Sequence, residues 1–95
     1  MKQVMDFYNI VEHVTESILK GQGLEIYYPR TENSEEGWRK IVPESITTDI
    51  PPEGEVLVVG KDRLSPGHIV NAYDHEEKGE LKSFILGKIK KVRFF

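Results

Sequence analysis

The three histidines, His13, His68 and His75, are the residues with the widest choice of chemistry in this chain. A zinc site needs His or Cys ligands at short spacings, but no pair of these histidines has such a spacing, and the chain contains no cysteine. The run Asp74-His75-Glu76-Glu77 has a composition typical of a solvated hairpin tip. We therefore expect no metal and no cofactor.

Nucleophilic catalysis would need a serine held against a histidine and an acid. Ser65, His68 and Asp74 lie close together in the sequence, but no elbow motif holds the serine. The glycines of GQG (21–23) follow a helical pattern instead of a strand, which is the wrong context for a phosphate-binding loop. The residue inventory predicts that the protein is not an enzyme.

Aromatic and basic side chains are the remaining groups with binding chemistry. The last fourteen residues, KSFILGKIKKVRFF, carry five basic side chains and no acid, although the whole chain has a formal net charge of -3. Aromatic rings among cations provide a surface on which single-stranded nucleic acid or a nucleotide stacks. Lysines on an edge strand also guard against aggregation. The charge pattern alone therefore favours a solvated edge over a binding surface.

The bulk composition limits these interpretations. A chain of 95 residues makes one domain with a single small core. No apolar run is long enough to span a membrane, and the first twenty residues carry Asp6, Glu12 and Glu16, unlike a secretory signal. The absence of cysteine fits a reducing compartment. We expect a cytoplasmic protein with no membrane association, whose overall acidity leaves only local surfaces for a polyanion.

The apolar pattern predicts a helix over residues 3–20, followed by a stop. The apolar side chains at helical spacing are Phe7, Val11, Val14 and Ile18. Gly21 and Gly23 come next, and glycine readily takes the left-handed conformation at a helix end. Glu16 lies four residues before Lys20, the favourable order for a helical ion pair.

After residue 23 the apolar period changes to two, which predicts strands. The expected strands are 24–28, 38–42, 55–59 and 68–73, followed by one long bent strand or two short ones within 81–94. Strand 55–59 is apolar on both faces, which is typical of a central strand. Pro43 is expected to end the second strand, and Gly87 to mark a bulge.

The predicted fold is therefore α+β and mainly β, with an N-terminal helix (1–22) and a small five- to six-stranded antiparallel barrel (24–95). The side chains expected in its core are Val11, Val14, Ile18, Ile26, Ile41, Val58, Val70, Ile85 and Ile89.

The order of these elements resembles that of WYL domains. Four segments carry the resemblance: the helix end, glycine and Leu24-x-Ile26-x-Tyr28 in SILKGQGLEIYYPR (17–30), RKIVP (39–43), HIVNAYD (68–74) and KSFILGKI (82–89). RKIVP is similar to the family's Arg-x-Val-x-Pro segment, and KSFILGKI to its Arg-x-Phe-x-x-x-Arg-Ile segment. The similarity covers about residues 14–92.

This chain departs from the family pattern at two places. His68-Ile69-Val70 stands in the position of the Trp-Tyr-Leu triplet, or Val56-Leu57-Val58 does in a second alignment. Lys82 and Lys88 replace the two arginines of the last motif. Lysine keeps the charge but loses the planar fork that binds phosphate or carboxylate through two bonds.

The resemblance implies a single WYL-like domain over residues 1–95, with an SH3-like or Sm-like barrel. WYL domains occur in bacterial transcription regulators and in phage-defence or CRISPR-associated proteins, where they resemble sensor modules for nucleic acid or other anions. The resemblance thus implies a non-enzymatic regulatory or ligand-sensing module that binds an anionic ligand, such as a nucleotide or single-stranded nucleic acid.

The expected ligand site combines charge with aromatic surface. Its residues are Tyr28, Arg39, His68, Tyr73, Lys82 and Lys88. In this set the cations hold an anion, the tyrosines offer a stacking face, and the histidine adds a contact that depends on its protonation. The alternative is a protein-protein interaction or self-assembly domain, a homodimer for example, in which VRFF (92–95) extends a sheet into a second chain.

Overall fold

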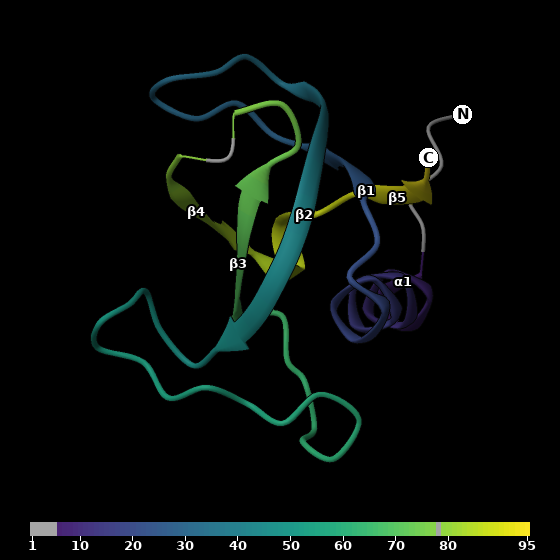
Figure 1. Ribbon diagram of the computed structural model, residues 1–95, viewed down its shortest axis with the longest axis vertical. Coiled ribbons are helices and arrows are strands. Elements are labelled where there is room, and N and C mark those ends of the chain that lie inside the picture. The colour runs from purple at the N-terminus through teal and green to yellow at the C-terminus, as the bar shows by residue number, and fades with distance from the viewer. Residues whose placement is uncertain (1–5, 78) are drawn as a thin grey trace.

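The computed structural model describes residues 6–77 and 79–95, which form one helix and a five-stranded antiparallel sheet (Figure 1). The elements are α1 (Phe7–Lys20), β1 (Leu24–Tyr28), β2 (Gly37–Thr47), β3 (Ile69–Asp74), β4 (Leu81–Ile85), the 3-10 helix η1 (Leu86–Lys88) and β5 (Lys91–Phe94). The spatial order is β4-β3-β2-β1-β5, so the first and last strands are neighbours. The predicted α+β, mainly β class is confirmed.

α1 follows the sequence pattern closely. Its buried side chains are Ile10, Val14 and Ser17. The helix ends after Lys20 because Gly21 takes a left-handed φ of 64°. The expected ion pair between Glu16 and Lys20 is present, at 3.7 Å. The expected helical residues 3–5 lie outside the described residues, and no helix in the described part is long and apolar enough to cross a membrane.

The core lies between α1 and one face of the sheet. On β1, Leu24, Ile26 and Tyr28 are buried and alternate with half-buried side chains, as a strand with one core face requires. The buried apolar cluster consists of Ile10, Val14, Leu24, Ile26, Tyr28, Ile41, Ile46, Val70, Ala72, Phe84, Leu86, Ile89 and Val92. Five of the predicted core residues belong to it, namely Val14, Ile26, Ile41, Val70 and Ile89. Val11, Ile18 and Ile85 are half-buried.

The predicted central strand at 55–59 is wrong. Residues 48–68 form a connection between β2 and β3, in which Val56 makes one isolated bridge to Thr47. The Asp62 carboxylate accepts the N–H of Val58, and the carbonyl of Val58 accepts the N–H groups of Lys61 and Asp62. This turn occupies the N–H and the carbonyl of Val58, which a strand would use to pair with its neighbours. Leu57 packs against the core, whereas Val58 is 58% exposed and so is wrongly placed in the predicted core.

β2 does not end at Pro43 but continues to Thr47. The register with β3 shifts between Pro43 and Ser45, so Glu44 is an extra residue. Proline has no N–H to donate, and a bulge is one of the places where a sheet tolerates it. The extra residue also shifts the alternation of inward and outward side chains along β2 by one position, so that Ile46 faces the core.

Gly87 does not mark a bulge in a long strand. It lies in η1, between the two short strands β4 and β5. Its N–H donates to the carbonyl of Pro66 at 2.8 Å, and a Cβ at this position would lie 2.5 Å from the Pro66 Cβ. Glycine is therefore required here because the chain passes close to Pro66.

The corrected core gives a pair of substitutions with opposite expected outcomes. Ile26→Ala should lower the free energy of unfolding by about 2–5 kcal/mol, because it removes a fully buried side chain and leaves a cavity. Val58→Ala should change it by less than about 0.5 kcal/mol, because this side chain is exposed. Urea unfolding of both variants measures the difference. Equal losses would contradict the placement of residues 55–59 outside the sheet.

Candidate ligand-binding site

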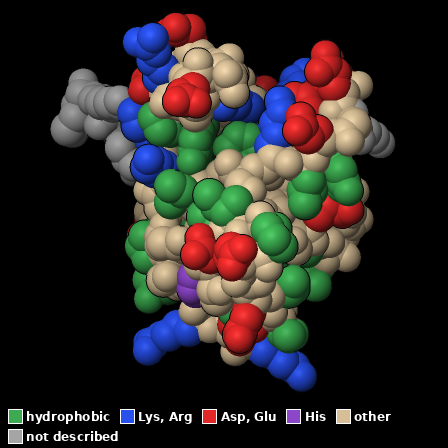
Figure 2. All heavy atoms as spheres, turned by 90° about the vertical axis from the view of Figure 1, so that its left-hand side faces the viewer, with side chains coloured by type: hydrophobic (Ala, Val, Ile, Leu, Met, Phe, Trp, Pro, Cys, Tyr) green, Lys and Arg blue, Asp and Glu red, His purple; other side chains and the backbone are tan. Residues whose placement is uncertain are grey.

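The first part of β2 has one edge without a strand partner. β2 pairs with β1 over residues 37–41 and with β3 over residues 41–47. Beyond Asp74 the described backbone contact is the N–H of His75 to the carbonyl of Lys40, at 3.0 Å. A cavity of about 460 Å³ opens at this edge, between the β1–β2 loop and the β3–β4 loop. Figure 2 shows this upper end of the molecule hollowed between two charged protrusions.

We call this cavity the edge pocket, and it is lined by Glu25, Ser34, Glu35, Trp38, Arg39, Lys40, Ile41, Asp74, Glu76, Lys82 and Phe84. Three of these side chains are cations, namely Arg39, Lys40 and Lys82. Among the described residues, none of the three forms an ion pair with a carboxylate. Lys40 lies instead over the ring of Phe95, with its Nζ 5.4 Å from the ring centre.

Three of the four pocket carboxylates have partners of their own. Glu25 lies 2.9 Å from Arg93, and Glu35 lies 3.9 Å from Arg30. Oδ1 of Asp74 accepts the N–H groups of Glu77 and Glu76, and these bonds lower the pKa of Asp74. The fourth carboxylate, Glu76, is exposed. Among the described residues the pocket thus holds three cations that form no ion pair, beside four carboxylates, and the charge of Lys82 also contributes to the lowered pKa of Asp74. An anion from solution can bind to the donors of these cations that no carboxylate occupies.

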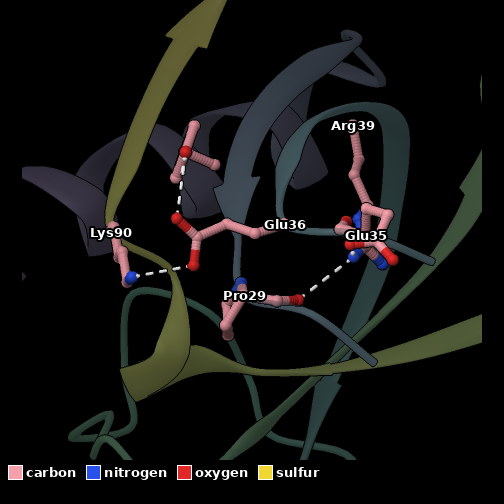
Figure 3. A network of polar contacts seen from close by, with 6 residues as sticks. Pro29, Glu35, Glu36, Arg39 and Lys90 are labelled. Atoms are coloured by element: carbon pink, nitrogen blue, oxygen red, sulfur yellow. Dashed lines mark hydrogen bonds and ion pairs between the residues drawn. The ribbon is translucent and has the colours of Figure 1, made fainter. Parts of the chain in front are cut away.

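Arg39 is held in place from three sides. It lies opposite Ile26 in the β1–β2 register, and therefore on the core side of the sheet. Its Nη2 donates to the carbonyls of Pro29 and Glu35, at 3.1 and 3.0 Å (Figure 3). Its Cζ lies 5.4 Å from the ring centre of Tyr28. Both ends of the β1–β2 loop therefore fix the guanidinium beside the pocket.

Tyr28 supports Arg39 from within the core. Its hydroxyl accepts the N–H of Ile85 at 2.8 Å, and its ring packs edge to face against Phe84 with centroids 5.1 Å apart. The side chain is 4% exposed, and this burial raises the pKa of its hydroxyl. A ring buried in this way has no open face for a base, so its role here is to position Arg39.

The six predicted site residues do not form one cluster. Lys82 lies opposite Ala72 and lines the edge pocket with Arg39. His68 and Lys88 lie at the other end of β3 and β4, about 20 Å away by the length of these strands. There Nδ1 of His68 accepts the N–H of Ser65, and the His68 carbonyl accepts the N–H of Leu86. Tyr73 alternates with Ala72 and faces the opposite side of the sheet.

The set of site residues predicted from the sequence did not include Lys40 or a second group of residues near the pocket. Lys40 follows Arg39 in the middle of the predicted strand 38–42, and its basic side chain next to Arg39 was the available signal. The second group, here called the aromatic strip, consists of Tyr27, Trp38, Lys91 and Arg93 on the outer face of β1, β2 and β5. Only the register of three strands brings these four side chains together.

No metal site emerges from the described residues, where no group of three or more His, Cys, Asp or Glu side chains is placed to hold an ion. No protein-family model matches this chain, and no curated protein sequence matches it. The resemblance to WYL domains therefore stays a prediction from the motifs.

The bond between Tyr28 and Ile85 can be tested with Tyr28→Phe. This change leaves a partly buried N–H without its acceptor, so the free energy of unfolding should fall by about 1–3 kcal/mol. The amide of Ile85 should also exchange faster with solvent, as measured by hydrogen exchange. Tyr8→Phe is the matched control, because Tyr8 is 73% exposed. Unchanged exchange at Ile85 would show that the hydroxyl is not its acceptor.

The raised pKa of Tyr28 also predicts a pH dependence. Because folding favours the neutral phenol, this contribution to stability is complete below the unfolded pKa of about 10 and is lost as pH rises through the folded pKa. The wild type should therefore lose more stability than Tyr28→Phe between about pH 9 and about pH 11. Tyr27, whose pKa a hydrogen bond to Glu36 raises, is present in both proteins. Equal losses in urea unfolding would contradict the assignment.

Proposed function

We propose that this protein is a non-enzymatic, WYL-like regulatory or ligand-sensing module that binds an anionic ligand at the edge pocket. The observation that carries the proposal is the set of Arg39, Lys40 and Lys82, three cations without ion pairs around one cavity. The ligand class is a nucleotide or single-stranded nucleic acid, because phosphate oxygens accept charge-assisted hydrogen bonds from several directions at once.

The chemistry of the lining supports a phosphate group in particular. Arg39 offers a planar donor group that matches phosphate, while Lys40 and Lys82 act as mobile point charges. Ser34 adds a hydroxyl at the rim. The volume of about 460 Å³ lies in the usual range of small-molecule sites, about 300–1,000 Å³.

The proposal extends to the type of fold and to the biological setting. Three observations support an SH3-like or Sm-like barrel: the strand order, the position of η1 between β4 and β5, and the Tyr28 bond that joins β1 to β4. A role in transcription regulation or phage defence rests on the resemblance to WYL domains.

Self-assembly through edge strands has less support. The Tyr28 hydroxyl occupies the N–H of Ile85, which faces away from β3 because the ladder bond is made next to it, by Leu86 to His68. At the other edge, β5 carries Lys91 and Arg93. Both features work against the addition of a strand from a second chain.

The proposal predicts binding of a labelled single-stranded oligonucleotide at low salt, measured by fluorescence anisotropy. The double variant Lys40→Ala/Lys82→Ala should weaken binding and flatten the slope of log affinity against log salt by about 1.4, or about 0.7 for each cation. The control is Lys61→Ala/Arg63→Ala, which removes the same charge from the exposed 48–68 connection. Equal effects of both doubles, or no binding by the wild type at about 20 mM salt, would overturn the proposal.

A further inference from the structure

The outer face of β1 carries a row of side chains that the edge pocket does not explain. Tyr27 lies between Trp38 of β2 and Lys91 of β5 in the strand register. The Tyr27 and Trp38 rings meet edge to face with centroids 5.5 Å apart, and Nζ of Lys91 lies 5.8 Å from the Tyr27 ring centre. Since neighbouring strands lie about 4.8 Å apart, the row is about 10 Å long.

Arg93 lies over this row at stacking distance. Its Cζ is 3.8 Å from the ring centre of Trp38, and its Nε donates to the Glu25 carboxylate at 2.9 Å. The Arg93 side chain is 55% exposed, whereas that of Glu25 is 13% exposed. Glu25 therefore holds the guanidinium against the indole and shows little negative charge itself. A guanidinium in this position turns its outer plane to solvent, and such planes stack on nucleic-acid bases.

The charged side chains around this row favour an anion as the ligand. Glu36 accepts the Tyr27 hydroxyl at 3.1 Å and is ion-paired with Lys90 at 3.2 Å, so its carboxylate is engaged (Figure 3). Lys91 makes no ion pair among the described residues. The cations Lys91 and Arg93 thus lie beside the half-buried ring of Tyr27 and the ring of Trp38, which is 37% exposed.

The aromatic strip is continuous with the edge pocket. Trp38 belongs to both, since it lines the pocket and also contacts Tyr27 and Arg93. Its neighbour Arg39 faces the core side of the same strand, because successive side chains of a strand alternate. A chain that leaves the phosphate position at Arg39 reaches Trp38 by passing around the edge of β2, where both residues line the pocket.

We propose that the edge pocket and the aromatic strip form one track for single-stranded nucleic acid. One phosphate binds between Arg39 and Lys82, and the following bases stack on the Arg93–Trp38 pair and against Tyr27, while Lys91 faces the backbone. The partner is single-stranded because only unpaired bases expose the faces that such stacking needs. The track rests on the proposed function, and it adds a dependence of affinity on strand length.

The test compares a nucleoside monophosphate with single strands of about four and about eight nucleotides. Trp38 is the only tryptophan in the sequence, so its fluorescence reports binding to the wild type and to the variants that keep it, and the anisotropy of labelled probes measures the Trp38 variants. Affinity should rise from the mononucleotide to the longer strands. Trp38→Leu should lower the affinity for the longer strands by at least about fivefold more than the affinity for the mononucleotide, which meets Trp38 only at the pocket lining. Trp38→Phe should restore most of the loss, because it returns a ring.

Two further variants keep the test decisive. Tyr8→Leu, which removes an exposed ring from α1, is the matched control and should change nothing. Lys91→Ala removes a half-buried surface charge without opening the core, and it should flatten the salt slope by about 0.7 for the longer strands only. Circular dichroism and urea unfolding check that each variant is folded. If Trp38→Leu does not fold, Lys91→Ala decides the question.

The outcomes separate the track from the pocket. Equal affinity for all lengths, with no effect of Trp38→Leu or Lys91→Ala, overturns the track and leaves the pocket intact. Binding that needs Trp38 but not Lys40 and Lys82 overturns the pocket as the anchor, and with it the proposed function. No binding of any of these probes at about 20 mM salt overturns both.

Discussion

The hydrogen bond from the Ile85 amide to the Tyr28 hydroxyl joins the ends of two strands that do not pair with each other. The two residues are 57 positions apart in the sequence. The same tyrosine ring packs against Phe84 in the core and lies below the guanidinium of Arg39. One side chain thus sets the distance between β1 and β4, fills part of the core and supports a cation at the edge pocket. The contact thus complements the strand pairings that position β2 and β3 around the pocket.

The local charge at the edge pocket depends on which charged side chains are paired with each other, and not on the net charge of the whole chain. The chain is acidic overall, at -3. Near the edge pocket, however, Glu25 and Glu35 are bound to arginines, and Asp74 is bound to backbone N–H groups. Among the described residues, Arg39, Lys40 and Lys82 beside them form no ion pair, although the charge of Lys82 contributes to the lowered pKa of Asp74. Local binding of an anion is therefore compatible with an acidic protein, because distant charges are screened over about 10 Å at ordinary salt.

The sequence correctly predicted those elements that depend on residues close to one another in the chain. The end of α1 at Gly21 and the alternation of Leu24, Ile26 and Tyr28 follow from nearby residues. The strand predicted at 55–59 does not form, because the Asp62 carboxylate, four residues after Val58, accepts the Val58 N–H, and the backbone N–H groups of Lys61 and Asp62 donate to the Val58 carbonyl. β2 continues beyond Pro43 because its pairing with β3 contains a bulge, and the residues of β2 alone do not predict that bulge.

The candidate site also combines features that local sequence predicts with features that depend on how the strands pair. Two of the candidate residues, Arg39 and Lys82, line one pocket, while Lys88, six positions after Lys82, lies in η1 beyond the far end of β4. The aromatic strip could not be predicted, because it needs the register of three strands.

That register has a consequence for the order of folding. Arg93 and Glu25 are 68 residues apart, so pairing β5 with β1 closes one of the longest loops in the chain, and such closures are slow. The β2 edge with Arg39 and Lys40 depends on nearer contacts with β1 and β3. A molecule in which β5 has not yet docked would keep cations at the pocket but would lack Lys91 and Arg93 over the rings. Recognition of a long strand would then be restricted to molecules that have completed the sheet.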